Sequence, residues 1–402
     1  MSSPRPRALV VAPQPFFTPR GTPFSVYYRT LVCSEIGLQM DVLTYGEGQD
    51  PDLPGVSIHR IPRFRFLGPI PIGPSFHKLF LDGFIALWMF ALLCRRRYAL
   101  VHAHEEAVFL AALFQPLFRF RLIYDMHSSL PQQLRNFQFT KRRWLFRIFE
   151  RLEDLSLRRA DVVITICPDL AEYAAPRMKD PTRHFLIENS IFEPVRLKGA
   201  GTETGGGDAA AVVEVPSGRK AIVYAGTFEP YQGLSLLLEA FARVRREEPA
   251  AFLVLIGGAP AQVAQYRAEA ERIGLSAADY RILPRAPQAV ARAGTRAAHA
   301  QASPRISGTN TPLKIYEQLA SGVPLVATRI HSHTQVLDDT VAYLAAPDAE
   351  SFAAALIAAL RDGREGNPRA AAARRLYEER YARPVYERKL RAALARVEVC
   401  AA

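Results

Sequence analysis

The stretch SGTNTPLKIYEQLASGVPLVAT, residues 307–328, leads from a loop of small polar residues through a helical segment into a short apolar segment. Residues 313–319 have the spacing of a helix, and the closing PLVAT is typical of a buried parallel strand. The stretch contains only two charged side chains, Lys314 and Glu317, three residues apart and therefore on one face of the helix. Residues 307–328 are therefore predicted to form one helix-strand unit of an α/β fold, with a cation and a carboxylate just after a loop.

The same alternation of strands and helices extends through the rest of the chain. Short runs rich in β-branched and other apolar residues predict further buried strands at residues 8–13, 39–46, 100–104, 121–127, 161–167, 220–226, 251–258 and 280–286. A late helix is expected to begin after Asp348 as N-cap and to end at Gly363. Repeated β-α-β units predict parallel sheets with helices on both faces.

A change of composition divides the chain in two. Residues 198–219 are dominated by Gly, Ala, Thr and Ser without any period, as in a linker or a loosely ordered loop. The chain of 402 residues is long enough for two or three domains. We therefore expect one doubly wound, Rossmann-like domain at 1–197 and a second at 220–378. The final helical stretch, 379–402, is expected to bend at Pro384 and to cross back to the first domain.

The charge balance favours anionic partners. Lys and Arg number 51 against 39 Asp and Glu, a net charge of +12. Phosphates, acidic lipid surfaces and nucleic acid all fit this excess, and so does a simple bias of composition. No recognised nucleic-acid-binding module accompanies the charge, so nucleic acid is the weakest of these partners.

Neither a disulfide framework nor a membrane span is predicted. The four cysteines are scattered without a CxxC pair, which favours a reducing compartment and disfavours a zinc site: Cys33, Cys94, Cys167 and Cys400. The N-terminal apolar run is too short for a signal peptide. The longest apolar segment, residues 83–94, falls short of the roughly 20 residues that span a bilayer.

The loop and helix at 307–319 predict an anion site. Backbone N–H groups of residues 307–312 can converge at the start of the helix. A cation such as Lys314 in the first turn opposes the helix dipole, and a bound phosphate would explain its position. Glu317 can accept hydrogen bonds from ribose hydroxyls, so the two side chains together describe a nucleotide-diphosphate site. The alternative is a surface Lys–Glu pair.

Several segments resemble one family of enzymes. Residues 311–328, TPLKIYEQLASGVPLVAT, resemble the donor-site signature of the retaining GT-B glycosyltransferases of family four. YAGTFEPYQGLSLLLEAF (224–241), ILPRAP (282–287), PDAESFAAALIAAL (347–360) and the N-terminal 19–46 also resemble it, in the right order. The resemblance implies a GT-B fold, with two Rossmann-like domains facing a central cleft. The N-terminal domain would bind the acceptor and the C-terminal domain a nucleotide-diphosphate sugar.

By this resemblance Glu317 is the carboxylate that binds the ribose. A second family carboxylate lies eight residues earlier, where this chain has Thr309. The loop instead resembles that of a subgroup with small polar residues, in which backbone amides from Gly308 to Thr311 face the donor sugar. The resemblance thus implies a donor-binding loop of Gly308, Thr309, Asn310, Thr311 and Pro312.

A second departure concerns the diphosphate. The family often has a basic pair in the loop after YAG, where this chain has Thr227 and Gln232. Lys314 and Arg305 would then have to supply the missing positive charge. Thr227 stays a predicted donor-binding residue.

In the N-terminal half, two residues are candidates for the same site. Gly21, in PRGTP, permits a close backbone approach at a helix start, although it also fits a plain turn. His127 ends the predicted strand 121–127, and the resemblance implies that it faces the donor sugar. A structural role is the alternative for His127.

The segment VHAHE, residues 101–105, contains further polar residues. His102 and His104 lie on one face of a strand, but the sequence offers no third metal ligand, so we expect structural or cleft-lining roles. Glu105 and Glu106 follow at the strand end, and either is a candidate for contact with the acceptor.

The resemblance implies a reaction without a bound metal or other cofactor, the nucleotide-diphosphate sugar being a co-substrate. Helix amides and basic side chains would stabilise the departing diphosphate, whose own oxygen helps to deprotonate the acceptor. The predicted catalytic residues are His127, Lys314 and Glu317. We expect sugar transfer to a glycan or lipid-linked acceptor in cell-envelope polysaccharide or glycolipid synthesis. The alternatives are a degenerate homologue that binds without turnover and, disfavoured by the lack of further acid/base carboxylates, a GT-B epimerase.

Two N-terminal segments, 59–68 and 137–159, mix arginine with aromatic residues. In the second, helical spacing gathers apolar residues on one side: Trp144, Leu145, Ile148, Leu152 and Leu155. Basic residues crowd the rest: Lys141, Arg142, Arg143, Arg147 and Arg151. Such a helix can lie on an anionic membrane, or its apolar side can pack on the sheet. We expect a cytoplasmic protein, peripheral at the inner face of the membrane if the helix lies on it.

Overall fold

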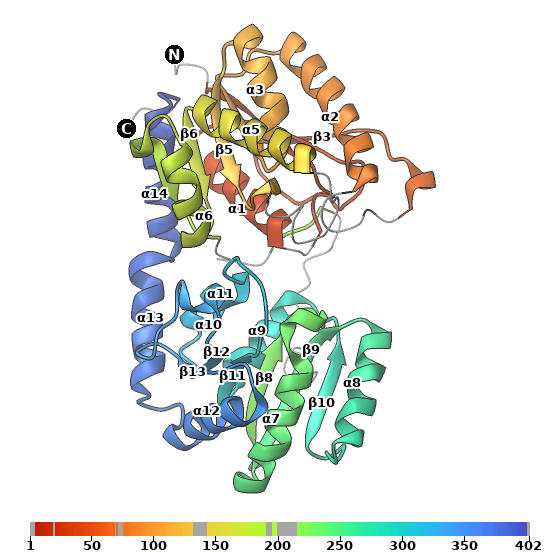
Figure 1. The fold of residues 1–402 in the computed structure, drawn as a ribbon, viewed down its shortest axis with the longest axis vertical. Coiled ribbons are helices and arrows are strands. Elements are labelled where there is room, and N and C mark those ends of the chain that lie inside the picture. The colour runs from red at the N-terminus through yellow and green to blue at the C-terminus, as the bar shows by residue number, and fades with distance from the viewer. Residues whose placement is uncertain are drawn as a thin grey trace. The chain divides into compact units, whose positions relative to one another are not determined.

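The computed structural model describes residues 5–18, 21–68, 70, 75–131, 143–189, 195–198 and 215–399. The chain divides into two compact units (Figure 1). Unit 1 comprises Met1–Ile191, Val195–Ala200 and Arg383–Ala402, and unit 2 comprises Phe192–Pro194 and Gly201–Ala382. Most of the predicted linker, residues 199–214, lies outside the described residues, as does Cys400.

Unit 1 is built on a parallel seven-stranded sheet of order β3-β2-β1-β4-β5-β6-β7. Its strands are β1 (Arg7–Ala12), β2 (Gln39–Thr44), β3 (Val56–Arg60), β4 (Leu100–His104), β5 (Arg121–Met126), β6 (Val162–Thr165) and β7 (His184–Leu186). The strand order reverses between β1 and β4, as in doubly wound folds.

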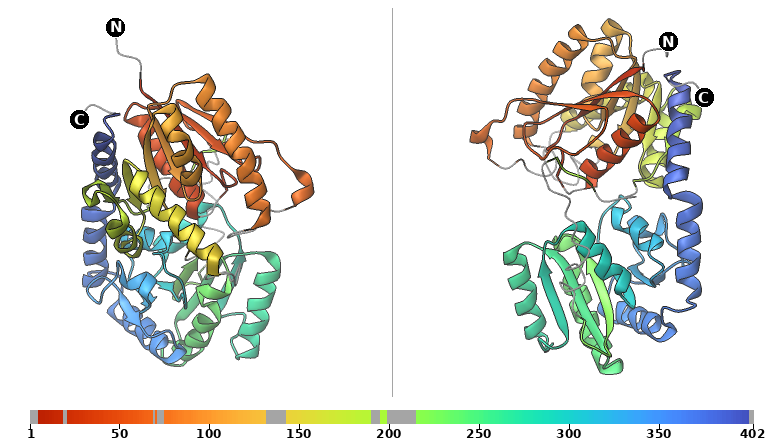
Figure 2. Two further views of the ribbon diagram at one scale, coloured as in Figure 1. Left: turned by 45° about the horizontal axis from the view of Figure 1, so that its top comes forward. Right: turned by 180° about the vertical axis from the view of Figure 1, so that it is seen from behind.

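Helices cover both faces of this sheet (Figure 2). They are α1 (Gly21–Glu35), α2 (Phe76–Arg95), α3 (Ala107–Phe118), α5 (Arg143–Arg159), α6 (Pro168–Ala174) and α14 (Arg383–Arg396), with short 3-10 turns η1 (Arg65–Leu67), η2 (Ala175–Arg177) and η3 (Pro181–Arg183). Leu81, Ile85 and Met89 of α2 pack with Leu9 and Val11 of β1 in the core.

The segment that appeared too short to span a membrane belongs to a longer helix. Helix α2 has 20 residues, and an 18-residue window within it has a mean hydropathy of 1.6, so by length and composition it could cross a membrane. Only 28% of this window is buried, although one side of the helix packs into the core. The core helix of a folded domain passes the same test, so the length alone decides nothing.

The last helix of the chain belongs to unit 1. Lys389 Nζ of α14 lies 2.6 Å from Glu188 Oε2, and Arg383 pairs with Glu35 of α1. The Tyr386 ring lies 5.2 Å from the guanidinium carbon of Arg29. Helix α14 therefore completes the packing around α1.

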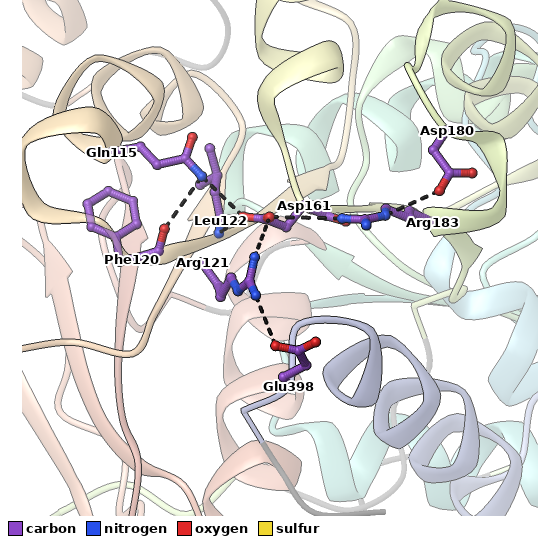
Figure 3. A network of polar contacts seen from close by, with 8 residues as sticks. All are labelled: Gln115, Phe120, Arg121, Leu122, Asp161, Asp180, Arg183 and Glu398. Atoms are coloured by element: carbon purple, nitrogen blue, oxygen red, sulfur yellow. Dashed lines mark hydrogen bonds and ion pairs between the residues drawn. The ribbon is translucent and has the colours of Figure 1, made fainter.

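A network around Asp161 fixes the residues that follow α14 (Figure 3). The Asp161 carboxylate accepts hydrogen bonds from Leu122 N at 2.8 Å and Gln115 Nε2 at 3.1 Å. Arg121 Nη1 lies 3.4 Å from Asp161 Oδ1, and its Nη2 donates to Glu398 Oε2 at 3.0 Å. The C-terminal segment is thereby attached to β5.

Unit 2 holds a parallel six-stranded sheet of order β10-β9-β8-β11-β12-β13. Its strands are β8 (Lys220–Ala225), β9 (Ala251–Gly258), β10 (Tyr280–Pro284), β11 (Ala300–Ser303), β12 (Leu325–Thr328) and β13 (Tyr343–Ala345). Its helices are η5 (Pro230–Gln232), α7 (Leu234–Glu247), α8 (Pro260–Arg272), α9 (Gln288–Ala297), α10 (Leu313–Ala320), α11 (His331–Thr334), α12 (Ala349–Asp362) and α13 (Pro368–Arg380). The strand order reverses between β8 and β11.

The structure confirms the predicted α/β class and each predicted strand. Asp348 caps α12 by accepting from Ser351 N at 2.8 Å, and Gly363 ends it with a positive φ of 71°. Four strands had not been predicted: β3, β7, β11 and β13. Strand β11, AQAS, lacks an apolar run because Gln301 is buried in it and donates to Val323 O at 3.3 Å. Helix α13 ends at Arg380, so the break precedes Pro384.

Candidate functional site

Two loops of unit 2 meet at the carboxyl ends of β8 and β11, where the strand order reverses. Such switch points are where open α/β sheets bind ligands. Ile306 N donates to Tyr231 O at 3.0 Å and so joins the loop after β11 to the loop after β8. Gly233 permits this approach, because its φ is +73° and a Cβ there would lie 2.0 Å from Pro304 O. The two loops are packed backbone to backbone.

Lys314, in the first turn of α10, is a half-buried cation at this point. Its Nζ donates to Gln232 Oε1 at 3.2 Å and lies 4.1 Å from the centre of the Tyr224 ring. Burial, with the neighbouring Arg305, lowers the pKa of Lys314 to about 7. Within the described part of the chain, no carboxylate pairs with it. The surface pair with Glu317 is therefore not formed.

Arg305 is the second cation, and it organises the loop that follows β11. Its Nε donates to Ser307 O at 2.7 Å and its Nη1 to Asn310 O at 3.2 Å. Gly308 makes this possible, since a Cβ at that position would lie 2.1 Å from Arg305 Nη2. The guanidinium carbon lies 5.2 Å from the centre of the Tyr231 ring. Burial lowers the pKa of Arg305.

The start of α10 offers further groups to an anion. Its N-cap residue, Pro312, makes no side-chain cap, and its carbonyl accepts from Ile315 N at 3.0 Å. The N–H groups of Leu313 and Lys314 have no partner among the described residues and can bind an anion. The Thr311 hydroxyl is buried and has no hydrogen-bond partner among the described residues. With Lys314 and Arg305 close to one another, these groups form a site with the chemistry to bind a phosphate.

Glu317 pairs with a residue that the sequence did not suggest. Arg292 of α9 lies with Nε 2.7 Å and Nη2 2.6 Å from the same oxygen, Oε1 of Glu317. Both side chains are about three-quarters buried, with exposed fractions of 21% for Arg292 and 26% for Glu317. Both bonds go to Oε1, and within the part of the chain that the structure describes no residue donates to Oε2, so this oxygen can accept from another donor.

His333 is a buried residue near Lys314 and Arg305. Its Nδ1 donates to Thr328 O at 2.8 Å, so its Nε2 accepts from Ser303 Oγ at 3.0 Å. Burial, with the nearby Lys314 and Arg305, lowers its pKa to about 4, so the ring is neutral. His333 thereby ties the ends of β11 and β12 together without adding charge.

The remaining predicted donor residues lie in the same two loops. Thr227 is exposed, and its carbonyl accepts from Tyr224 Oη at 2.7 Å. Thr309 is exposed as well, and its carbonyl accepts from Gln335 Nε2. Thr227 lies in the loop after β8, which is joined to the loop after β11 by the Ile306–Tyr231 hydrogen bond. The other predicted donor residues lie in the loop after β11 or in α10: Arg305, Gly308, Thr309, Asn310, Thr311, Pro312, Lys314 and Glu317.

In unit 1, a buried polar cluster lies at the ends of β4 and β5. Asp125 Oδ2 accepts from Arg29 Nε at 2.8 Å and from His102 Nε2 at 2.9 Å. His104 Nδ1 lies 2.9 Å from His127 Nε2. Burial would raise the pKa of Asp125, but Arg29 and the histidines hold it well below its usual range. Burial lowers the pKa of His127 to about 4.

The expectation that His102 and His104 have no third potential ligand was wrong. Asp125 lies within 4.8 Å of both, because the β4–β5 register sets His104 opposite Asp125. The geometry would admit a metal ion, but Arg29 already supplies a cation to the same buried carboxylate. A metal ion would have to share that carboxylate with a guanidinium.

Two carboxyl groups nearby titrate near neutral pH, which was not expected. Burial and the neighbouring Glu106 carboxylate together raise the pKa of Glu105 to about 7. Burial also raises the pKa of Asp82 to about 7. A cavity of about 10 Å³, room for one water molecule, is lined by Glu105, Glu106 and Ser128 among others.

Gly21 begins α1 and is exposed, whereas its neighbours Pro19 and Arg20 lie outside the described residues.

Two family models match this chain, one in each unit. Residues 33–190 match the "Glycosyl transferase 4-like domain" and residues 219–362 match "Glycosyl transferases group 1". The chain belongs to the group 1 glycosyltransferases. The resemblance in the sequence is therefore confirmed.

Relatives of this glycosyltransferase share its fold at low identity. A phosphatidyl-myo-inositol mannosyltransferase of Mycobacterium tuberculosis is 28% identical over 152 residues, which are 37% of this chain and 39% of that protein. The match thus spans about two-fifths of the curated relative. Sucrose-phosphate synthase from Thermosynechococcus elongatus has a TM-score of 0.74 at 18% identity, over 99% of this chain and 100% of the other. HepE from Anabaena, solved with UDP, has a TM-score of 0.70 at 14% identity, over 97% and 99%. The glycosyltransferase has the GT-B fold.

Sequence reasoning missed two residues of the unit 2 site in this glycosyltransferase, Arg292 and His333. Arg292 lies on an amphipathic helix whose arginines look alike in the sequence, and only packing selects one of them. His333 belongs to the short run HSHT, and neither its spacing nor its neighbours predict a buried ring.

Proposed function

We propose that this glycosyltransferase moves a sugar from a nucleotide-diphosphate sugar to a glycan or lipid-linked acceptor, with retention of the anomeric configuration. One observation carries the proposal. Lys314 and Arg305, two cations without carboxylate partners among the described residues, lie beside an uncapped helix start at the switch point of unit 2. A diphosphate supplies the negative charge that this place lacks.

The diphosphate is bound by Lys314, Arg305 and the first-turn amides of α10, and the Thr311 hydroxyl donates to it. Glu317 accepts from the ribose hydroxyls through the oxygen that Arg292 leaves free. The loop Gly308–Pro312 and Thr227 line the sugar. These assignments rest on the shared location of the residues and on the chemistry of their side chains.

Bond breaking and bond making then proceed on one face of the sugar. The bond from the anomeric carbon to the diphosphate oxygen breaks, and negative charge develops on that oxygen. Lys314, Arg305 and the helix amides stabilise the charge. The same oxygen accepts the proton of the acceptor hydroxyl, whose oxygen forms the new glycosidic bond. The products are a nucleoside diphosphate and the glycosylated acceptor.

From unit 1, His127 donates or accepts a hydrogen bond with a hydroxyl of the donor sugar. With a pKa of about 4 the ring is neutral at pH 7 and contributes a hydrogen bond without charge. The start of α1 at Gly21 offers backbone amides, and Glu105 or Glu106 contacts the acceptor. The reaction needs no metal ion, and a chelator should leave its rate unchanged. The protein works in the cytoplasm on cell-envelope glycan or glycolipid synthesis.

The proposal is tested with a panel of nucleotide-diphosphate sugars that differ in base and sugar. Donor turnover is followed by release of the nucleoside diphosphate, and the product anomer is assigned by proton NMR. Glu317→Gln should lower turnover about 100-fold, because the ribose loses its charged acceptor. Arg374→Gln, on exposed α13, is the matched control. Full turnover in Glu317→Gln, or a product of inverted configuration, contradicts the proposal.

The second candidate is a homologue that binds a nucleotide sugar without turnover, motivated by Thr309 and Gln232. One contact favours the enzyme: Lys314 reaches Gln232, so a cation lies beside the position where the family places a basic residue. Tight donor binding without even slow hydrolysis, for every donor in the panel, would favour the second candidate.

A further inference from the structure

Three helices of unit 1 expose an unusual amount of apolar surface. Among the described residues, 14 large apolar side chains are exposed, and 12 of them lie on η1, α2, α3 and α5. We call these 12 the apolar face: Phe66, Phe76, Leu79, Phe80, Leu87, Phe90, Leu113, Leu117, Trp144, Ile148, Leu152 and Leu155. Scattered exposed leucines are ordinary, but a concentration on one side of one unit marks an interaction surface.

The apolar face is continuous across the helices. Phe90 of α2 lies 5.9 Å from Phe114 and 5.8 Å from Phe118 of α3, between ring centres. Arg159 Nη1 of α5 donates to Ala112 O of α3 at 3.0 Å. Figures 1 and 2 show α2, α3 and α5 next to one another on the outside of unit 1.

Helix α5 turns a mixed side inward, with Glu153, Ser156 and the core residue Leu157 buried. Glu153 is fully buried and accepts from Ser129 Oγ at 2.9 Å and from Tyr173 Oη at 2.6 Å. Trp144 and Ile148 point to the outside instead, with 56% and 42% of their surface exposed. The alternative in which the apolar side of this helix packs on the sheet is therefore wrong for its described residues. A helix that buries a carboxylate and exposes tryptophan is expected to have an apolar partner.

The charges around the apolar face are mostly of one sign. The most exposed charged residues on α2 and α5 are arginines: Arg95, Arg147, Arg151, Arg158 and Arg159. The acidic residues of the same helices are partly or fully buried, and one of them, Asp154, pairs with Arg177 at 3.6 Å; the others are Asp82, Glu150 and Glu153. Arginines beside an apolar stripe with an exposed tryptophan fit the headgroups and the acyl boundary of an anionic bilayer.

We propose that the apolar face rests on an anionic lipid bilayer, with α2 and α5 lying along the interface. A second copy of the chain fits less well. In a two-fold contact the face would meet itself, and the arginines of one copy would lie against those of the other. An anionic surface pairs with these arginines and covers the apolar side chains at once. The proposal goes beyond sugar transfer and does not depend on it.

The test is sedimentation of the full chain with vesicles, without donor or acceptor. Vesicles of phosphatidylcholine with phosphatidylglycerol should bind the protein, and vesicles of phosphatidylcholine alone should bind it more weakly. The variant Leu87→Ser, Leu117→Ser, Ile148→Ser changes one exposed residue on each helix and should bind at least about tenfold more weakly. Ile306→Ser, an exposed isoleucine of unit 2, is the matched control and should bind as the wild type.

A second variant separates charge from apolar contact. Arg147→Gln, Arg151→Gln, Arg158→Gln should lose the preference for phosphatidylglycerol and the salt dependence of binding, while weak binding to neutral vesicles remains. Circular dichroism verifies that each variant is folded. Unchanged binding of the serine variant, or no binding by the wild type, overturns the proposal. So does a lipid-free dimer that the serine variant converts to a monomer, because the face would then belong to a second copy.

Discussion

Unit 1 and unit 2 each hold a cation withdrawn from water, and the two differ in what neutralises them. Arg29 in unit 1 is fully buried, and its Nε lies 2.8 Å from Asp125 Oδ2. Lys314 in unit 2 makes its hydrogen bond to the neutral amide of Gln232. A buried charge that the fold itself neutralises is part of the framework. A charge that the fold leaves unbalanced marks the place where a ligand must bring the opposite charge.

The largest expected effect comes from breaking the balanced pair. Arg29→Met leaves the Asp125 carboxylate buried without its guanidinium and should lower the free energy of unfolding by about 3–5 kcal/mol. Urea denaturation followed by circular dichroism measures the loss. Arg29→Met with Asp125→Asn should cost less than the sum of the single changes, since no lone charge remains. A loss below about 1 kcal/mol for Arg29→Met would show that the pair is not structural.

Removing the unbalanced cation should affect catalysis and not stability. Lys314→Met should lower the rate of transfer about 100- to 1,000-fold, the usual cost of losing one group that stabilises developing charge. The midpoint of urea unfolding should stay the same or rise, because the cost of desolvating the ammonium offsets its contacts with Gln232 and Tyr224. Initial rates and denaturation curves of one preparation measure both. If Lys314→Met were destabilised but fully active, Lys314 would be a structural cation like Arg29 and not part of the donor site.

The affinity for a nucleoside diphosphate should depend on pH through Lys314. Its pKa in the free protein is about 7, and only the ammonium form attracts the diphosphate. Between pH 7 and 9 the free protein must therefore take up a proton to bind, and the affinity should fall by about tenfold per pH unit. Isothermal titration with UDP or GDP, whichever binds, measures the slope and the proton uptake. Lys314→Arg should flatten the profile, and a wild-type profile that is already flat contradicts the assignment.

The smallest effect is expected at Arg292, which orients a carboxylate rather than touching the diphosphate. If Glu317 accepts from the ribose, a 2′-deoxynucleotide should bind more weakly than the ribonucleotide. Arg292→Ala should reduce that preference about three- to tenfold, since Glu317 loses the partner that holds it. Arg296→Ala on the same helix is the control. A preference that survives in Arg292→Ala would mean that Arg292 does not position Glu317.

The sequence predicted most of the strands, the helix start at residue 313 and the family, because these depend on periodicity and short motifs. It did not predict partners across large separations. Gln232 and Arg292 reach Lys314 and Glu317 only through the packing of α9 and η5 against α10. Asp125 lies beside the histidines because of the register between β4 and β5, and the sequence of either strand alone does not reveal that register.

Orientation was the other limit. The apolar stripe of residues 144–155 was read correctly as a stripe, but periodicity does not say which side of a helix faces the protein. The burial of Glu153, bonded to Ser129 and Tyr173, decided it. Strand β11 escaped prediction because the buried Gln301 interrupts its apolar pattern, with its amide nitrogen donating to Val323 O.

The attachment of α14 to unit 1 has a consequence for synthesis on the ribosome. A nascent chain of 382 residues contains all of unit 2 but lacks the last segment of unit 1. Tyr386, Leu390 and Leu394 of α14, all buried in the folded protein, are translated only after the whole of unit 2. Unit 1 begins to be translated first but is completed only after unit 2, and until α14 has been made its α1 face is exposed to chaperones and proteases.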